Sequence, residues 1–144
     1  TETQELHSQP MTMLNSDKTE QISEGHNLYF ILKDTNDLVS AVNSGRNQIG
    51  LSFTKPSDGI YVSISAHAHL STDPALIEQL WNPWAENWFT GKDDPSVRVL
   101  VAEGVSAEYW NVTDNKVTQL FKLIKGSVTG HTGEVGSDHK KLDL

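Results

Sequence analysis

The sequence contains no cysteine among its 144 residues. Disulfide bonds, thiolate metal sites and thiol nucleophiles are therefore excluded, and we expect a reducing, cytoplasmic environment. It also lacks any run of eighteen apolar residues, so it predicts no membrane-spanning helix. Basic residues are few: 11 Lys and Arg stand against 19 Asp and Glu, giving a formal net charge of −8. Because nucleic acids and anionic membranes attract cationic surfaces, we expect neither as a partner.

The length fits one domain spanning residues 1–144, and the hydrophobic content of 36% is enough for a core. Residues 126–144 read as a C-terminal tail that is loop or is ordered only by a partner. The chain does not begin with methionine, and Thr1–Glu5 is polar and acidic, unlike the start of a signal peptide. Since its first residues already read as part of a strand, we expect some N-terminal sequence to be missing.

Alternating and continuous apolar runs predict a mainly β chain interrupted by short helices. The clearest strand is Ile60–Leu70, in which Ile60, Val62 and Ile64 begin one face. The other expected strands are Thr3–Leu14 (an edge or bulged strand), Leu28–Leu32, Gln48–Thr54, Val97–Val105 and Ala107–Val112. Helices are expected from the Asp34–Asp37 capping cluster to Gly45, after Asp73-Pro74, and over Asn115–Lys125, with loops at Asn15–Gly25, Lys55–Gly59 and Gly91–Pro95. This order favours a small antiparallel barrel.

Three of the four tryptophans lie in one short stretch, at positions 81, 84 and 88, and the fourth is Trp110. Spacings of three and four residues place the first three on one face if the segment is helical. That pattern predicts a stripe of core or of dimer contact, while a pocket for a flat ligand is the alternative. Trp110 ends a strand-like segment, where it could cover a flat aromatic ligand or simply cap the core.

Motifs for catalysis and metal binding are weak. His67 and His69 lie on one strand face and could share a metal, but a solvated sheet face is the preferred interpretation because no third ligand lies at obvious spacing. No serine occupies a nucleophile-elbow motif, and no Gly-rich dinucleotide or phosphate loop is present. We therefore expect no metal site and can name no catalytic residue.

The helix start at Thr35 and Asn36 is a candidate anion site. Its backbone N–H groups and the positive end of the helix dipole favour a negative group. The Thr35 hydroxyl could add a donor and Lys33 could add charge. Ordinary helix capping explains the same residues.

Taken together, the sequence resembles the pyridoxamine 5′-phosphate oxidase-like flavoproteins, and within them the general stress protein branch. The matching stretches keep the family's order and cover nearly the whole chain. They are His7–Thr12, Leu28–Phe30, Tyr61–Ser65, Leu80–Pro83, Ser106–Trp110 and Lys140–Leu144. The resemblance implies an antiparallel, FMN-binding split β-barrel that here lacks the family's N-terminal helix and first strand. It also implies a homodimer with FMN in the groove between subunits.

The resemblance implies which residues border FMN. Gln9, Pro10, Met11 and Thr12 would lie beside the flavin, and Ile31, Lys33, Thr35 and Asn36 beside the ribityl chain and phosphate. Trp110 would reach the flavin from the partner subunit, and Lys116 is a weaker match.

The sequence departs from the family at two positions near the phosphate. Relatives commonly carry arginine where Gln9 stands and lysine near Asp37. A carboxylate near a phosphate dianion costs on the order of 1 kcal/mol, so FMN affinity is expected to be weak. The arginine- and histidine-rich motif of the true oxidases is also absent, so vitamin B6 oxidation is not expected. Three hypotheses follow: an FMN-dependent oxidoreductase of unknown substrate, a non-catalytic flavin binder, or a cofactor-free dimeric interaction protein.

Overall fold

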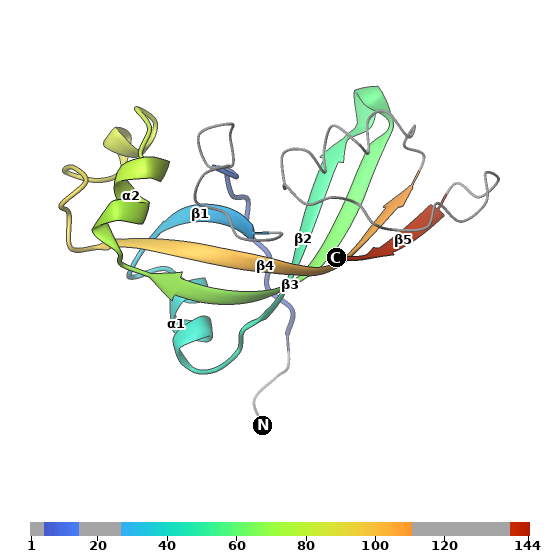
Figure 1. Ribbon diagram of the computed structural model, residues 1–144, viewed down its shortest axis with the longest axis horizontal. Helices are drawn as coiled ribbons and strands as arrows, with labels where there is room; N and C mark the ends of the chain where they lie inside the picture. Colours follow the sequence, from blue (N-terminus) through green and yellow to red (C-terminus); the bar gives the residue numbers. More distant parts are fainter. Residues whose placement is uncertain (1–4, 15–26, 111–138) are drawn as a thin grey trace.

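The computed structural model describes residues 5–14, 27–110 and 139–144. Its strands form one antiparallel sheet in the order β1-β4-β3-β2, with β5 pairing to β4. The sheet curves into a half-barrel flanked by two short helices (Figure 1), which confirms the predicted mainly β, split-barrel-like fold. The elements are β1 (Asn27–Lys33), α1 (Asp37–Asn43), β2 (Gln48–Lys55), η2 (Pro56–Asp58), β3 (Ile60–Ser71), α2 (Pro74–Leu80), η3 (Ala85–Asn87), β4 (Val97–Trp110) and β5 (His139–Asp143).

Strand β4 organises the sheet. It pairs with β3 along one edge, while its other edge is shared by β1, opposite residues 97–103, and β5, opposite residues 106–110. The sequence predicts two strands here, over Val97–Val105 and Ala107–Val112, but the structure has a single strand over Val97–Trp110. The expectation that residues 126–144 are loop, or are ordered only by a partner, is also wrong for their last part, because β5 pairs there with β4 of the same chain.

A β-bulge explains why the sequence reads as two strands. Ser65 pairs with Ser106 and Ala66 with Gly104, so Val105 is the extra residue, and its side chain is exposed. One inserted residue reverses which face the following side chains occupy. The buried positions of β4 therefore change from Leu100 and Ala102 before the bulge to Ala107 and Tyr109 after it.

The sheet packs a hydrophobic layer on each face. Strand β3 alternates as predicted, with Val62, Ile64, Ala66 and Ala68 buried between exposed positions. These side chains join Leu28, Phe30, Leu100 and Val39 of α1 in the first layer. The second layer lies on the opposite face of β1 and β4 and includes Tyr29, Ile31, Val99, Val101, Ile77, Leu80 and Phe89. Because successive strand residues point to opposite faces, β1 is buried almost throughout.

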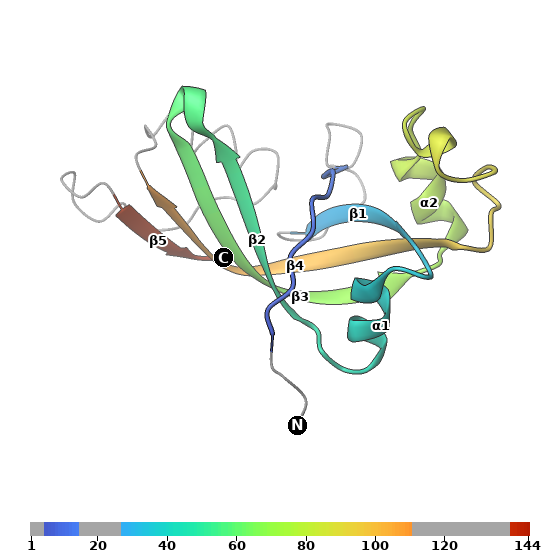
Figure 2. The same ribbon diagram turned by 180° about the vertical axis from the view of Figure 1, so that it is seen from behind.

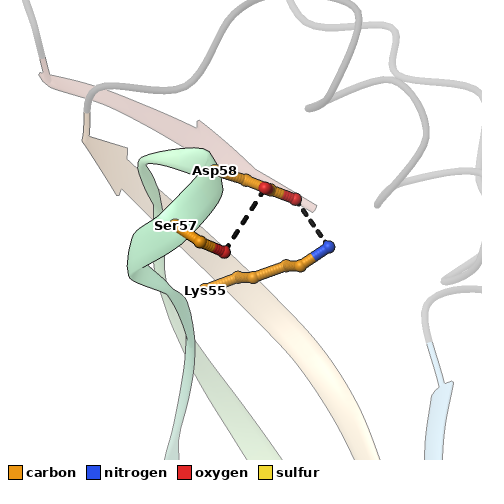
Figure 3. Close-up of polar contacts among 3 residues, drawn as sticks. All are labelled: Lys55, Ser57 and Asp58. Atoms are coloured by element: carbon orange, nitrogen blue, oxygen red, sulfur yellow. Dashed lines mark hydrogen bonds and ion pairs between the residues drawn. The ribbon is translucent and has the colours of Figure 1, made fainter.

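Local signals in the sequence set the ends of α1 and of the β2–β3 turn. The Asn36 side chain accepts a hydrogen bond from the Leu38 N–H at 2.9 Å, which caps α1. Gly45 follows the helix with φ 91°, a conformation that glycine adopts without a steric penalty. In the turn, Gly59 has φ 67°. Lys55 Nζ lies 2.6 Å from Asp58 Oδ2, and the Ser57 hydroxyl donates to the other carboxylate oxygen, Oδ1, at 3.4 Å (Figure 3).

The prediction of a strand over Thr3–Leu14 is wrong for the residues that the structure describes there. Residues 5–14 form no strand, and their backbone contact with the sheet is one hydrogen bond from the Leu14 N–H to the Tyr29 carbonyl at 2.9 Å. Pro10 lacks an N–H to donate to a ladder, which disfavours regular pairing at this edge. In Figure 2 this segment, drawn in dark blue, runs past α1 and across the sheet toward β1. The predicted loop Asn15–Gly25 and helix Asn115–Lys125 lie outside the described residues.

A carboxylate organises the loop that leads into β4. Asp94 accepts hydrogen bonds from the N–H and hydroxyl of Thr90 and from the N–H and hydroxyl of Ser96, at 2.7–3.3 Å. The Thr90 N–H, followed by the Ser96 hydroxyl and N–H, lowers the pKa of Asp94 from 3.8 to about 2. The ionised carboxylate is therefore part of the folded loop.

This network predicts a pH-dependent effect of Asp94→Asn. A depressed pKa in the folded state contributes stability above the usual pKa of 3.8, and that contribution disappears as the pH falls toward about 2. The variant should thus be less stable than the parent near neutral pH, and the difference should shrink between pH 4 and 2. Urea denaturation across this range measures it, with Asp93→Asn as control. A difference that is constant with pH would contradict the assignment.

Candidate functional site

The structure brings Gln9 and Asn36 together, although they are 27 positions apart in the chain. The Gln9 Nε2 donates to Asn36 Oδ1 at 3.2 Å, and Asn36 Nδ2 lies 3.4 Å from Gln9 Oε1. The same Asn36 oxygen caps α1, so the amide pair fixes the 5–14 segment against the start of that helix. Two stretches that the resemblance places beside one ligand therefore do meet in this chain.

The rest of the His7–Thr12 stretch lies along the first hydrophobic layer. Met11 is half-buried and packs with that layer, as does Met13, while Pro10 and Thr12 are exposed. The Gln9 side chain also contacts the Met11 sulfur at 3.6 Å. The segment therefore presents polar and backbone groups outward while its methionines anchor it to the sheet.

Ile31 and Lys33 lie on the other face of the sheet. The Ile31 side chain is buried in the second layer, so its own atoms are not open to a ligand. Lys33 Nζ lies 6.0 Å from the centroid of the Phe89 ring, which belongs to the same layer. The lysine expected to add positive charge at the helix start is thus directed toward an aromatic ring instead.

The electrostatics around the amide pair are negative. Asp34 and Asp37 flank Thr35 and Asn36 and are exposed, and Asp37 occupies the first turn of α1. Because Asn36 already accepts from Leu38, one N–H of that turn is satisfied within the chain. The exposed Thr35 hydroxyl and the two amides suit uncharged polar groups of a ligand better than they suit a phosphate dianion.

Trp110 lies at the far end of β4 from this cluster. Lys33, which precedes the helix start, pairs with Val97 at the first residue of β4, whereas Trp110 is its last residue. At about 3.3 Å per residue, the strand separates the two by roughly 40 Å along its length. Lys33 and Trp110 therefore lie at opposite ends of β4 within one chain. Lys116 lies outside the described residues.

The two histidines lie on the exposed face of β3. His67 pairs with Gln48 on one side and with Glu103 on the other, and both His67 and His69 are exposed. Within residues 5–14, 27–110 and 139–144, no group of three or more His, Asp or Glu side chains is placed to hold a metal ion. The same described ranges contain no helix with the length and hydropathy needed to cross a membrane.

The tryptophan segment does not form the predicted helical stripe. Helix α2 ends at Leu80, and Trp81 adopts an extended conformation. Pro83 explains this break, since proline disfavours helix for the residue before it and cannot donate within a helix. Trp81 instead packs against the second layer, with its ring 6.1 Å from that of Phe89, whereas Trp84 and Trp88 are exposed.

Residues 1–134 of the chain match the model of a protein family described as "Pyridoxamine 5'-phosphate oxidase like". Protein bli-3 of Neurospora crassa is 30% identical over 96 residues, which cover 60% of this chain and 46% of bli-3. The match thus spans less than half of that curated relative.

Two crystal structures share the fold. The general stress FMN/FAD binding protein from Xanthomonas citri has a TM-score of 0.60 and 25% identity, covering 90% of this chain and 80% of the other. A general stress protein 26 from Jannaschia sp. CCS1 has a TM-score of 0.61 and 22% identity, covering 94% and 82%. With the family model matching most of its length, the chain belongs to the pyridoxamine 5′-phosphate oxidase-like family.

Proposed function

We propose that this protein is a flavin-binding homodimer, with FMN as its cofactor and an oxidoreductase activity on a substrate not yet identified. The observation that carries the proposal is the contact between Gln9 and Asn36, which joins two stretches that the family resemblance assigns to one flavin site. The family and the flavin-binding description of the Xanthomonas citri neighbour support the cofactor class. A cytoplasmic location is part of the same proposal.

The residues of the cluster fit the uncharged parts of a flavin. Amide groups of Gln9 and Asn36 and the Thr35 hydroxyl both donate and accept, as the carbonyls and nitrogens of an isoalloxazine ring and the ribityl hydroxyls require. Backbone groups along Pro10–Thr12 would border the ring. When bound, a flavin supplies hydride and single-electron transfer, and the protein's contribution is to orient it and to adjust the charge around it.

The position of Trp110 supports the homodimer. The resemblance assigns this indole to the flavin of the partner subunit, and Trp110 ends β4 at the opposite end of that strand from Lys33, the residue that pairs with Val97. Each dimer would then hold two equivalent sites related by the twofold axis.

Flavin binding is tested by titrating the purified protein with FMN and following the quenching of flavin fluorescence. We expect saturable binding, and Trp110→Ala should weaken it about five- to tenfold, because loss of an aromatic stacking partner costs on the order of 1 kcal/mol. The variant should lose less free energy of unfolding than free energy of FMN binding. Equal losses in both would mean that Trp110 is only a core residue, and no binding at all would leave the cofactor-free interaction protein as the function.

Redox activity separates the enzyme from an inert binder. The protein loaded with FMN should bleach when NADH or NADPH is added without oxygen, and its colour should return in air. Free FMN at the same concentration is the control. A bound flavin that these donors reduce no faster than free FMN would favour the non-catalytic binder.

A further inference from the structure

Two indoles on the α2–η3 side of the molecule have no role in the proposed flavin site. Trp84 and Trp88 are 45% and 56% exposed, and their ring centroids lie 5.8 Å apart at an interplanar angle of 46°. We call them the indole pair. Large aromatic side chains are usually buried, so two adjacent exposed tryptophans mark a surface suited to binding.

The segment that carries the indole pair is firmly held. Ala85 and Phe89 are buried in the second layer, at 1% and 8% exposure. The Ala85 N–H bonds to the carbonyl and side chain of Asn82, and the Trp88 and Phe89 N–H groups bond to the Ala85 carbonyl. The inward residues thus fix the backbone of η3 while the indole pair stays outside. Preorganised aromatic rings cost little conformational entropy on binding.

The charge around the indole pair is negative. Residues 71–98 contain five carboxylates against Lys92 and Arg98, and Lys33 Nζ lies 6.0 Å from the Phe89 ring, so five acidic groups face three basic ones, a surplus of two negative charges. Glu86 lies between the two tryptophans in η3 and is exposed. Lys92 is already paired with Glu78 at 2.6 Å. The remaining surplus of negative charge therefore favours a ligand that is cationic and able to stack on indoles.

We propose that the indole pair docks an arginine-rich, basic segment of a partner protein. A guanidinium group stacks on indole faces and tolerates partial desolvation better than an ammonium group does, so arginine meets both requirements. A second copy of this chain would bring the same negative surface and be repelled. Anionic membranes and nucleic acids are disfavoured for the same reason.

This surface is separate from the proposed flavin site. The indole pair belongs to the segment that covers the second hydrophobic layer, whereas Met11 and α1 pack on the first, on the opposite face of the sheet. Figure 1 shows α2 and α1 on the two sides of the sheet. Peptide binding and flavin binding can therefore be measured independently.

The test uses an acetylated peptide of alternating arginine and glycine, with lysine-glycine and glutamate-glycine peptides of equal length for comparison. Isothermal titration of the full chain should show the arginine peptide binding most tightly and the glutamate peptide not binding. Trp84→Ala and Trp88→Ala should each weaken arginine-peptide binding about two- to fivefold, as expected for an exposed cation–π contact. Added salt should weaken binding further.

Matched controls keep the proposal falsifiable. Val105→Ala removes exposed apolar surface on β4 and should leave peptide affinity unchanged, and FMN titration of the tryptophan variants should match that of the parent. Equal binding of the arginine and lysine peptides, unaffected by either tryptophan variant, would overturn the proposal in favour of general charge attraction. Loss of self-association in Trp88→Ala without arginine-peptide binding would overturn it in favour of a contact between copies.

Discussion

Replacing Asp37 by lysine is expected to tighten FMN binding about tenfold while leaving riboflavin binding nearly unchanged. Asp37 lies in the first turn of α1, next to the Asn36 amide that contacts Gln9. Two unit charges 4 Å apart in water interact by about 1 kcal/mol, so reversing one charge near a dianion, at somewhat longer range and with salt screening, changes binding by about 1.4 kcal/mol. Riboflavin has the same ring and ribityl chain but no phosphate, so the charge of residue 37 should hardly affect its binding.

The comparison of the two flavins isolates the phosphate from the ring. Fluorescence titrations of both ligands at low and high salt measure it, with Asp93→Lys as a control that makes the same charge change in the loop before β4. Gln9→Arg should act in the same direction as Asp37→Lys. If Asp37→Lys raised riboflavin and FMN affinity equally, the phosphate would not lie near α1, although flavin binding itself would stand.

Leu100→Ala is expected to lower the free energy of unfolding by about 3 kcal/mol. Leu100 is completely buried in β4, the strand that pairs with β1 and β3, and it packs in the first hydrophobic layer. Truncating a buried leucine loses the transfer free energy of its methyl and methylene groups and leaves a cavity, which together cost 2–5 kcal/mol. A strand paired on both sides cannot readily move to fill that space.

Chemical denaturation followed by tryptophan fluorescence measures this loss. Val105→Ala is the matched control, because Val105 is on the same strand but is exposed at the bulge, and we expect it to change stability by less than about 0.5 kcal/mol. A loss of stability in Leu100→Ala as small as the loss in Val105→Ala would mean that the first layer is loosely packed.

Strong local signals were enough to predict most of the sheet and both described helices. The alternation in β3 places apolar side chains on one face whatever the partner strand is, because the period of a strand is two. Asp73-Pro74 and the Asn36 cap likewise start α2 and α1 through hydrogen bonds within a few residues. The order of these runs favoured a small antiparallel barrel, and the split β-barrel and the family came from the resemblance that the motifs carry.

Features that depend on distant contacts were mispredicted. The bulge at Val105 reads as a strand break because its cause lies in the pairing with β3, not in β4 itself. The residues of β5 were predicted to be part of the tail, because such a short segment forms a strand only when an edge of β4 is available to pair with it. The predicted tryptophan stripe required a helix, which Pro83 prevents. The spacing of the tryptophans also does not show which indoles are buried.

The sequence by itself therefore determined the starts of α1 and α2, the alternation in β3 and the net charge, because each depends on neighbouring residues or on composition. The tertiary structure decided that Gln9 meets Asn36, that Lys33 turns to Phe89, and that Trp84 and Trp88 face outward. These depend on how the chain crosses the sheet and on which face each residue occupies, and a single register or bulge reverses that face.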